Sequence, residues 1–559
     1  MDSSGDASYR PAKHLPFELA QHIGIFFEEK LYTQALNLLL NIISSGGVAD
    51  TSTYIPSPQH LALAATCLVH PCTTTRANNA EEEEAPNASL QLLRLTRTLV
   101  GPVNAKFNLA FSFTHFQSSR RGGRRRPSDE TPPDDDMRPL NLDLSKSASL
   151  WSRAEDFWHA VGWAFNCSVL HRERWERWQT WLEFMCGVLE DDWALRIKLY
   201  QEGANDESKG DIKTRRKKPN EPQILKESLI FRFVSEGVAG YGAYRRILRA
   251  IFADGGSSSV NEFREVFHHE LKQRRQDKQN IKKREVEVNI DKDEFGDYLT
   301  DDDDDDDEEN PENSKRNSSN DRIKTKPGPT RQTKRPRRGT RSSKDPNTDD
   351  ADPALPTAHS TNDISHLGGY QALALRQRLL HLLSNVADHL QTSFISLEDL
   401  YHLFVENIRH LPLPIFQAFV SPSVLPHFSA AAQTSLCEFL LFRMRESAAP
   451  MTDEMYLNQD KLEQCFLPYA ASTTSISDNA KVSMALEALL MLLADSEMLK
   501  ITPQLRDAVQ LGIETRADKV QTETKKSQAN RRLEDLEWGW LVESGERLMF
   551  LVDELLNQG

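Results

Sequence analysis

The chain has 559 residues, a formal net charge of −15 at pH 7 and a hydrophobic fraction of 38%. This apolar fraction is low for a fully globular chain and indicates cores interrupted by long polar tracts. The negative net charge argues against a protein that coats nucleic acid with its whole surface. The six cysteines form no Cys-x-x-Cys pair, so we expect buried free thiols in a reducing compartment rather than a structural zinc site.

The N-terminal part of the chain is predicted to be helical after a short tail. Residues 1–14 are polar, lack the apolar core of a secretory signal and are expected to be a disordered tail. Residues 15–117 show apolar residues at helical spacing, and Ser57 followed by proline is typical of a helix start. Within them, the polar segment 73–87 is expected to be a loop. Residues 118–145 contain a basic cluster and several prolines and are expected to be a disordered linker.

A tryptophan-rich helical region is predicted over residues 146–255, because seven of the nine tryptophans lie between Trp151 and Trp193. Three of them recur at three-residue spacing and cover a broad helix face. Each buried aromatic side chain removes about 150–250 Å² from water, so the cluster can anchor a core. A cage for a cation, a base or a peptide would instead need rings that converge on a concave pocket. We interpret the cluster as a structural aromatic core that includes Trp158, Trp163, Trp175, Trp178 and Trp181.

The rest of the chain divides into three parts. Residues 256–285 begin with an amphipathic pattern and are predicted to form an extended helix. Residues 286–366 are rich in acidic and basic runs and are expected to be a disordered linker. Residues 367–559 return to apolar residues at helical spacing and are predicted to be a C-terminal helical domain. The fold class is therefore all-α, an irregular and loosely HEAT-like array of stacked helices in two lobes. Whether the lobes touch stays open.

Compact basic clusters in polar segments, expected to be disordered, are the sharpest local signals and are typical of nuclear-import signals. The alternative is a solvated charge run, but several clusters in an acidic chain favour import and hence a nuclear location. A further basic cluster spans residues 120–126. The residues of the two assigned import signals are Lys334, Arg335, Pro336, Arg337 and Arg338 in one cluster, and Arg215, Arg216, Lys217 and Lys218 in the other.

Two motifs in the second linker suggest binding partners. The segment around Arg335-Pro336-Arg337 resembles an AT-hook, which binds the DNA minor groove, although it lacks the family's central glycine. Alternating Val286, Val288 and Ile290, followed by acidic residues, resemble the SUMO-interacting motif, in which a strand adds to a sheet edge.

The acidic run of the same linker suggests regulation by charge. Thr300 precedes seven consecutive aspartates and is a candidate phosphosite. The run itself suits basic partner proteins.

No catalytic residue, metal ligand or cofactor is predicted from the sequence. Gly237, Gly240 and Gly242 follow a helical pattern rather than a strand and have the wrong order for a dinucleotide-binding loop. His268, His269 and Glu270 are adjacent, so they point to different helix faces and cannot act as the HExxH zinc motif does. The longest apolar stretches fall short of the roughly 18 residues that a membrane span needs, so no membrane association is expected.

Together these features predict a non-enzymatic nuclear scaffold or adaptor subunit of a multi-protein complex, in chromatin regulation or genome maintenance such as DNA repair. Its expected partners are other protein subunits, with DNA, SUMO or basic proteins as further candidates through the linker. The alternatives are a nucleolar ribosome-assembly factor, a direct DNA-binding protein that uses a basic arm, and a helical enzyme with a scattered active site.

Overall fold

The structure is a computed structural model. It describes residues 9–45, 52–113, 140–207, 222–236, 241–272, 364–450, 456–500, 502–521 and 528–558. These residues hold twenty α-helices and a single pair of three-residue strands, so the predicted all-α class is confirmed. All of them belong to one compact unit. Among the described helices, none is long and apolar enough to cross a lipid bilayer.

The N-terminal region starts earlier and is more regular than the sequence suggests. Part of the expected tail, β1 (Ala12–His14), pairs in parallel with β2 (Thr53–Ile55). The prediction of a loop over residues 73–87 is wrong from Ala80 onwards, where a helix begins. Asn79 caps this helix, because its side chain accepts a hydrogen bond from the Glu82 amide. The helices of this region are α1 (Phe17–Glu28), α2 (Tyr32–Ser44), α3 (Pro58–Cys67), α4 (Ala80–Val100) and α5 (Phe107–Ala110).

The described residues between positions 146 and 262 form seven helices of very different length. They are α6 (Leu150–Arg153), α7 (Phe157–Leu170), α8 (Arg172–Glu207), α9 (Gln223–Lys226), α10 (Leu229–Ser235), α11 (Tyr241–Ile251) and α12 (Ser257–Glu262). The segment before them, expected to belong to a linker, buries Leu140, Leu142 and Leu144 in the core. The extended helix expected over residues 256–285 is not formed in its described part. The chain turns after Glu262, and turning lets the apolar residues that follow be buried.

The C-terminal region contains the remaining helices. They are α13 (Gly369–His389), α14 (Leu397–Ile408), α15 (Leu413–Val420), α16 (Ala430–Met444), α17 (Gln459–Cys465), α18 (Ile476–Asp495), α19 (Pro503–Gln521) and α20 (Gln528–Gln558). A short 3-10 helix, η6 (Ile364–Leu367), precedes them, so the last residues of the second expected linker are folded. Helix α13 buries the stripe that its apolar spacing indicates, which includes Leu375, Leu379 and Leu382, together with residues on both sides of it.

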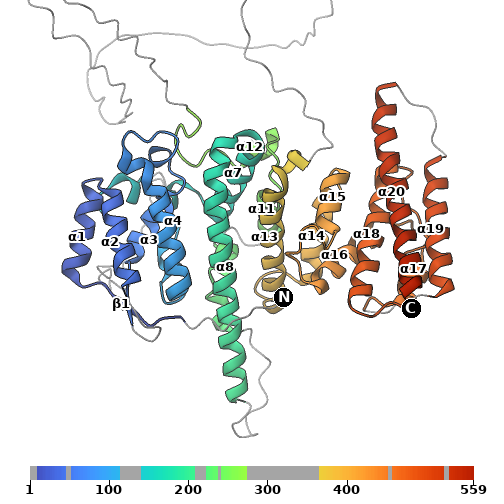
Figure 1. Cartoon of the computed structure of the whole chain (residues 1–559), viewed down its shortest axis with the longest axis horizontal. Helices are drawn as coiled ribbons and strands as arrows, with labels where there is room; N and C mark the ends of the chain where they lie inside the picture. The colour runs from blue at the N-terminus through green and yellow to red at the C-terminus, as the bar shows by residue number, and fades with distance from the viewer. Residues whose placement is uncertain are drawn as a thin grey trace, which may run out of the picture. The chain divides into compact units, whose positions relative to one another are not determined.

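Helices pack mainly on those one or two places away in the chain, which is the arrangement of a stacked-helix array. Helix α2 packs on α4, α7 on α8, α14 on α16, α16 on α18 and α18 on α20 (Figure 1). Contacts of α13 with α7, α8 and α11 join the helices before residue 273 to those after residue 363. The two helical regions therefore touch and share one unit.

The six cysteines are all free thiols, and five of them are buried among apolar side chains. Burial raises the pKa of Cys67, Cys186 and Cys437 to about 12, because the thiolate would lose its hydration. These three thiols therefore serve as small apolar core residues. Cys72, on the 3-10 turn after α3, is the exposed one.

Candidate functional site

The aromatic cluster of the sequence lies in the interior of the fold. Trp158, Trp163, Trp175, Trp178 and Trp181 are all buried. The rings of Trp178 and Trp181 meet edge to face with centroids 5.5 Å apart, and Phe157 stacks on Phe233 at 4.6 Å. Such ring pairs fill the space between α7, α8 and α10. The rings pack against one another and against neighbouring helices rather than converging on a cavity.

Glu270 sits at the centre of this cluster. Its buried carboxylate accepts hydrogen bonds from the indole Nε1 of Trp163 at 2.9 Å and of Trp178 at 2.7 Å. Arg174 donates to the same carboxylate through Nε at 2.8 Å and also donates to Thr74 and to the Val69 carbonyl. The charge is therefore paired and its oxygens are occupied, so the arrangement is a satisfied structural network without a vacant ligand position.

The role of Glu270 was missed at the sequence level. The sequence of His268-His269-Glu270 indicates only that these residues do not form an HExxH zinc motif. In the structure Glu270 follows His269, which adopts a left-handed backbone with φ 54°, and this turn directs the carboxylate inward beneath α7 and α8. A glutamate 92 residues after Trp178 carries no sequence signal that links the two.

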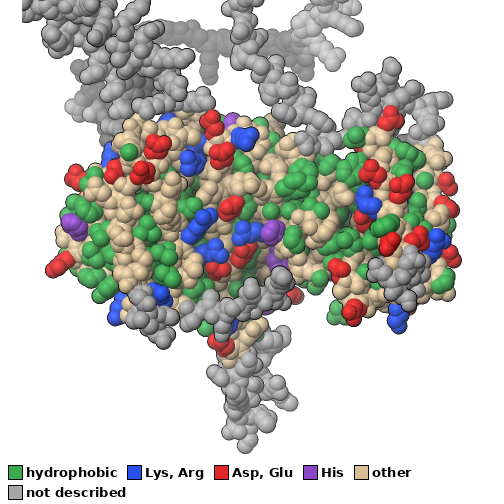
Figure 2. Space-filling view, in the orientation of Figure 1, with side chains coloured by type: hydrophobic (Ala, Val, Ile, Leu, Met, Phe, Trp, Pro, Cys, Tyr) green, Lys and Arg blue, Asp and Glu red, His purple; other side chains and the backbone are tan. Residues whose placement is uncertain are grey.

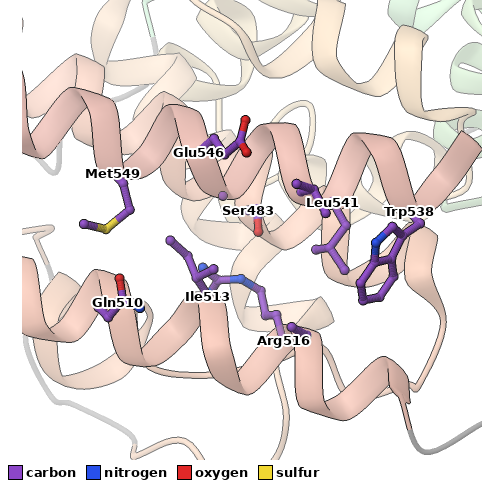
Figure 3. A pocket seen from close by; sticks show the side chains of 11 residues that line it. Ser483, Gln510, Ile513, Arg516, Trp538, Leu541, Glu546 and Met549 are labelled. Atoms are coloured by element: carbon purple, nitrogen blue, oxygen red, sulfur yellow. The ribbon is translucent and has the colours of Figure 1, made fainter.

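A concave site lies in the C-terminal region, where α18, α19 and α20 line a cavity of about 340 Å³ that is open to solvent on one side (Figure 3). Most of the side chains that line the cavity belong to α19 and α20, and Ser483 of α18 also lines it. Trp538 closes one end, and Gln510 and Met549 lie at the other. The main lining residues are Gln510, Ile513 and Arg516 from α19, and Trp538, Leu541 and Met549 from α20.

Arg516 is the buried charged group of this cavity, whereas Glu546, which also lines it, is exposed. Its Nη1 donates to the carbonyls of Leu467 at 3.1 Å and Tyr469 at 3.3 Å, just after α17. Its Nε and Nη2 have no hydrogen-bond partner among the described residues. Burial lowers the pKa of Arg516 to about 9, because the charged form is removed from water.

Gly512 explains how Arg516 reaches those carbonyls. A Cβ atom at position 512 would lie 1.8 Å from the Leu467 carbonyl oxygen, so only glycine lets α19 approach the chain after α17 this closely. The helix can then direct Arg516, one turn later, into the space between α18 and α20. Neither residue can be recognised from the sequence, because a Gly-x-x-x-Arg spacing in a helix is not a known motif.

The other sites predicted from the sequence lie outside the described residues. This holds for both import signals, for the candidate SUMO-interacting strand at Val286, Val288 and Ile290, and for the candidate phosphosite Thr300. Within the described part of the chain, no three histidine, cysteine, aspartate or glutamate side chains gather as a metal ion would require.

Comparison with protein-family models and with curated proteins finds no match for this chain.

Proposed function

We propose that this protein is a non-enzymatic scaffold or adaptor subunit of a multi-protein nuclear complex. The observation that carries the proposal is the outward face of α20, where Leu536 is 50% exposed and Phe550 is 62% exposed. The two residues are 14 positions apart in one helix and so share a face within about 40°. Contiguous apolar patches that stay exposed mark surfaces that bind other proteins, and we infer that Leu536 and Phe550 belong to such a patch.

A stacked-helix array suits this role, because it builds long surfaces from many helix faces. Exposed apolar residues are also found on α1, where Phe17 and Ile25 face solvent. The protein could thus bind more than one subunit, one at α1 and another at α20.

Chromatin regulation or genome maintenance is the proposed setting, supported by the basic import clusters and the motifs of the second linker. A ribosome-assembly factor would carry similar clusters and is the second candidate. The face in Figure 2 does not favour direct DNA binding, since its Lys and Arg side chains are mixed with Asp and Glu. A DNA-binding surface would gather positive charge on one face.

Affinity purification of the tagged full-length protein from nuclease-treated nuclear extract, followed by mass spectrometry, tests this proposal. We expect a stoichiometric set of chromatin or repair proteins. The double variant Leu536→Ser with Phe550→Ser should lose at least one of them, with its melting temperature unchanged. Leu199→Ser, an exposed apolar residue of α8, is the matched control and should keep the full set.

Two other outcomes would change the proposal. Recovery of pre-ribosomal proteins would replace the chromatin setting with ribosome assembly. A monomer that recovers no stoichiometric partner would contradict the scaffold role itself.

A further inference from the structure

We propose that the cavity between α18, α19 and α20 binds an apolar carboxylate with about ten non-hydrogen atoms in all. This site stands independently of the scaffold role. It rests on two features that the folded chain brings together, an apolar cavity and a buried guanidinium with unused donors.

The walls of the cavity are suited to an apolar ligand. Ile513, Trp538, Leu541 and Met549 supply aliphatic, aromatic and thioether surface (Figure 3). A volume of about 340 Å³ corresponds to roughly eleven water molecules at about 30 Å³ each. Ligand sites are typically apolar cavities of this kind with a small number of polar groups that fix orientation.

The polar group is the Nε–Nη2 edge of Arg516, which has no partner among the described residues. The same edge binds carboxylates elsewhere in this fold. Arg378 donates from Nε and Nη2 to the two oxygens of Glu190, at 2.8 and 2.6 Å. Arg249 donates from the same two atoms to Glu262, at 2.7 and 2.8 Å. The vacant edge of Arg516 therefore matches a bidentate carboxylate.

The comparison with Arg376, another fully buried arginine, shows what Arg516 lacks. Arg376 donates to three carbonyls, stacks on an aromatic ring and lies near the charge of Asp254. Arg516 has two carbonyl acceptors, both at Nη1, and within the described part of the chain no acidic side chain offsets its burial. A buried cation without a counter-ion is costly, and a ligand anion would remove that cost.

The charge of the ligand is set by Arg516, the one buried cation of the cavity lining, since Glu546 of the same lining is exposed to solvent. One guanidinium edge with two free donors matches a singly charged carboxylate better than a doubly charged phosphate. Such a group can come from a small amphiphile or from the carboxy terminus of a partner polypeptide with an apolar last residue. Both sources present the same chemistry to Arg516.

The test uses the full-length protein and isothermal titration calorimetry with octanoate, which has ten non-hydrogen atoms, and with 1-octanol as its neutral analogue. We expect octanoate to bind at least tenfold more tightly than 1-octanol. Arg516→Met should abolish this preference. Arg506→Met, an exposed arginine on the same helix that pairs with Asp553, is the matched control and should keep it.

A variant that leaves Arg516 intact guards against a folding defect. Ala517→Phe fills the cavity from α19 and should weaken octanoate and 1-octanol alike, with circular dichroism unchanged. The proposal is overturned if wild-type protein binds neither probe, binds both equally, or if Arg516→Met retains the preference for octanoate.

A second pair of probes distinguishes the two sources of the carboxylate. The peptide acetyl-Ala-Ala-Phe-Leu is titrated with a free carboxy terminus and as its amide. Tighter binding of the free peptide than of octanoate, lost in the amide, assigns the site to a polypeptide terminus. Tighter binding of octanoate assigns it to a small amphiphile.

Discussion

The guanidinium of Arg376 lies over the ring of Phe165, with its Cζ atom 3.9 Å from the ring centroid. The same group donates to the carbonyls of Ile251, Ala253 and Leu367. Because Phe165, Ile251 and Ala253 precede residue 273 and Arg376 follows residue 363, one side chain of α13 connects two distant parts of the chain. A buried arginine in this position fixes how the two helical regions pack.

We expect the two helical regions to stay together when the chain between them is cut. A protease site inserted between residues 273 and 363 and then cleaved should leave one particle on size-exclusion chromatography. The packing of α13 on α7, α8 and α11 provides the interface. Separation of the two fragments at micromolar concentration would contradict this interface.

Arg376→Met should lower the free energy of unfolding by about 3 kcal/mol, because three buried carbonyls lose their donor. Arg378→Met is the matched control on the same helix. Its ion pair with Glu190 is partly exposed and should be worth about 1 kcal/mol or less. Urea denaturation of the two variants compares them directly, and equal losses would show that Arg376 has no special role.

Glu270→Gln should destabilise the protein by about 3–5 kcal/mol, since it leaves the buried Arg174 without a counter-ion. The environment of Trp163 and Trp178 should change as well, which tryptophan fluorescence detects. Glu176→Gln, on the exposed side of α8, should change neither property. A stable Glu270→Gln variant with unchanged fluorescence would disprove the structural role of the network.

Two glycines should respond in opposite directions to substitution by alanine. Gly512→Ala brings a Cβ atom to 1.8 Å from the Leu467 carbonyl oxygen and should cost about 3 kcal/mol or more. Gly539→Ala meets nothing within 4 Å in α20 and should add about 0.5–1 kcal/mol, because alanine favours helix. Thermal melts of both variants measure these changes in stability. A Gly512→Ala variant with an unchanged melting temperature would exclude the close approach of α19 to the Leu467 carbonyl.

Stability should fall as the pH falls below about 6.5, because buried histidines resist protonation. Burial lowers the pKa of His60 to about 4, and its Nε2 has no hydrogen-bond partner among the described residues. Between about pH 6.5 and pH 4 the unfolded chain binds the proton and the folded chain does not, so this contribution is present above pH 6.5 and lost towards pH 4. His70, whose pKa burial lowers to about 3, acts in the same direction.

The contribution of His60 should be about 2 kcal/mol between pH 7 and pH 5. Urea denaturation at the two pH values measures it, with His60→Leu as the comparison. The variant should lose correspondingly less stability on acidification. An identical loss in both proteins would show that His60 is not the titrating group.

Local patterns in the sequence were enough for the class of the fold. The leucine stripe of α13 can be recognised in the sequence because contacts along a helix face join residues three or four positions apart. The same holds for the start of α14, where the Ser396 side chain accepts a hydrogen bond from the Asp399 amide at 3.1 Å. The core position of the tryptophans follows in the same way from their number and spacing.

The tertiary structure decided which polar residues are buried and what they face. Glu270 lies under Trp178, Arg376 on Phe165, and Arg516 against Leu467, each at a separation of 49 residues or more. Nothing in the local sequence fixes such pairs, since burial of a charge depends on which helices meet. The cavity around Arg516 exists for the same reason, because α18, α19 and α20 line it only once they have packed together.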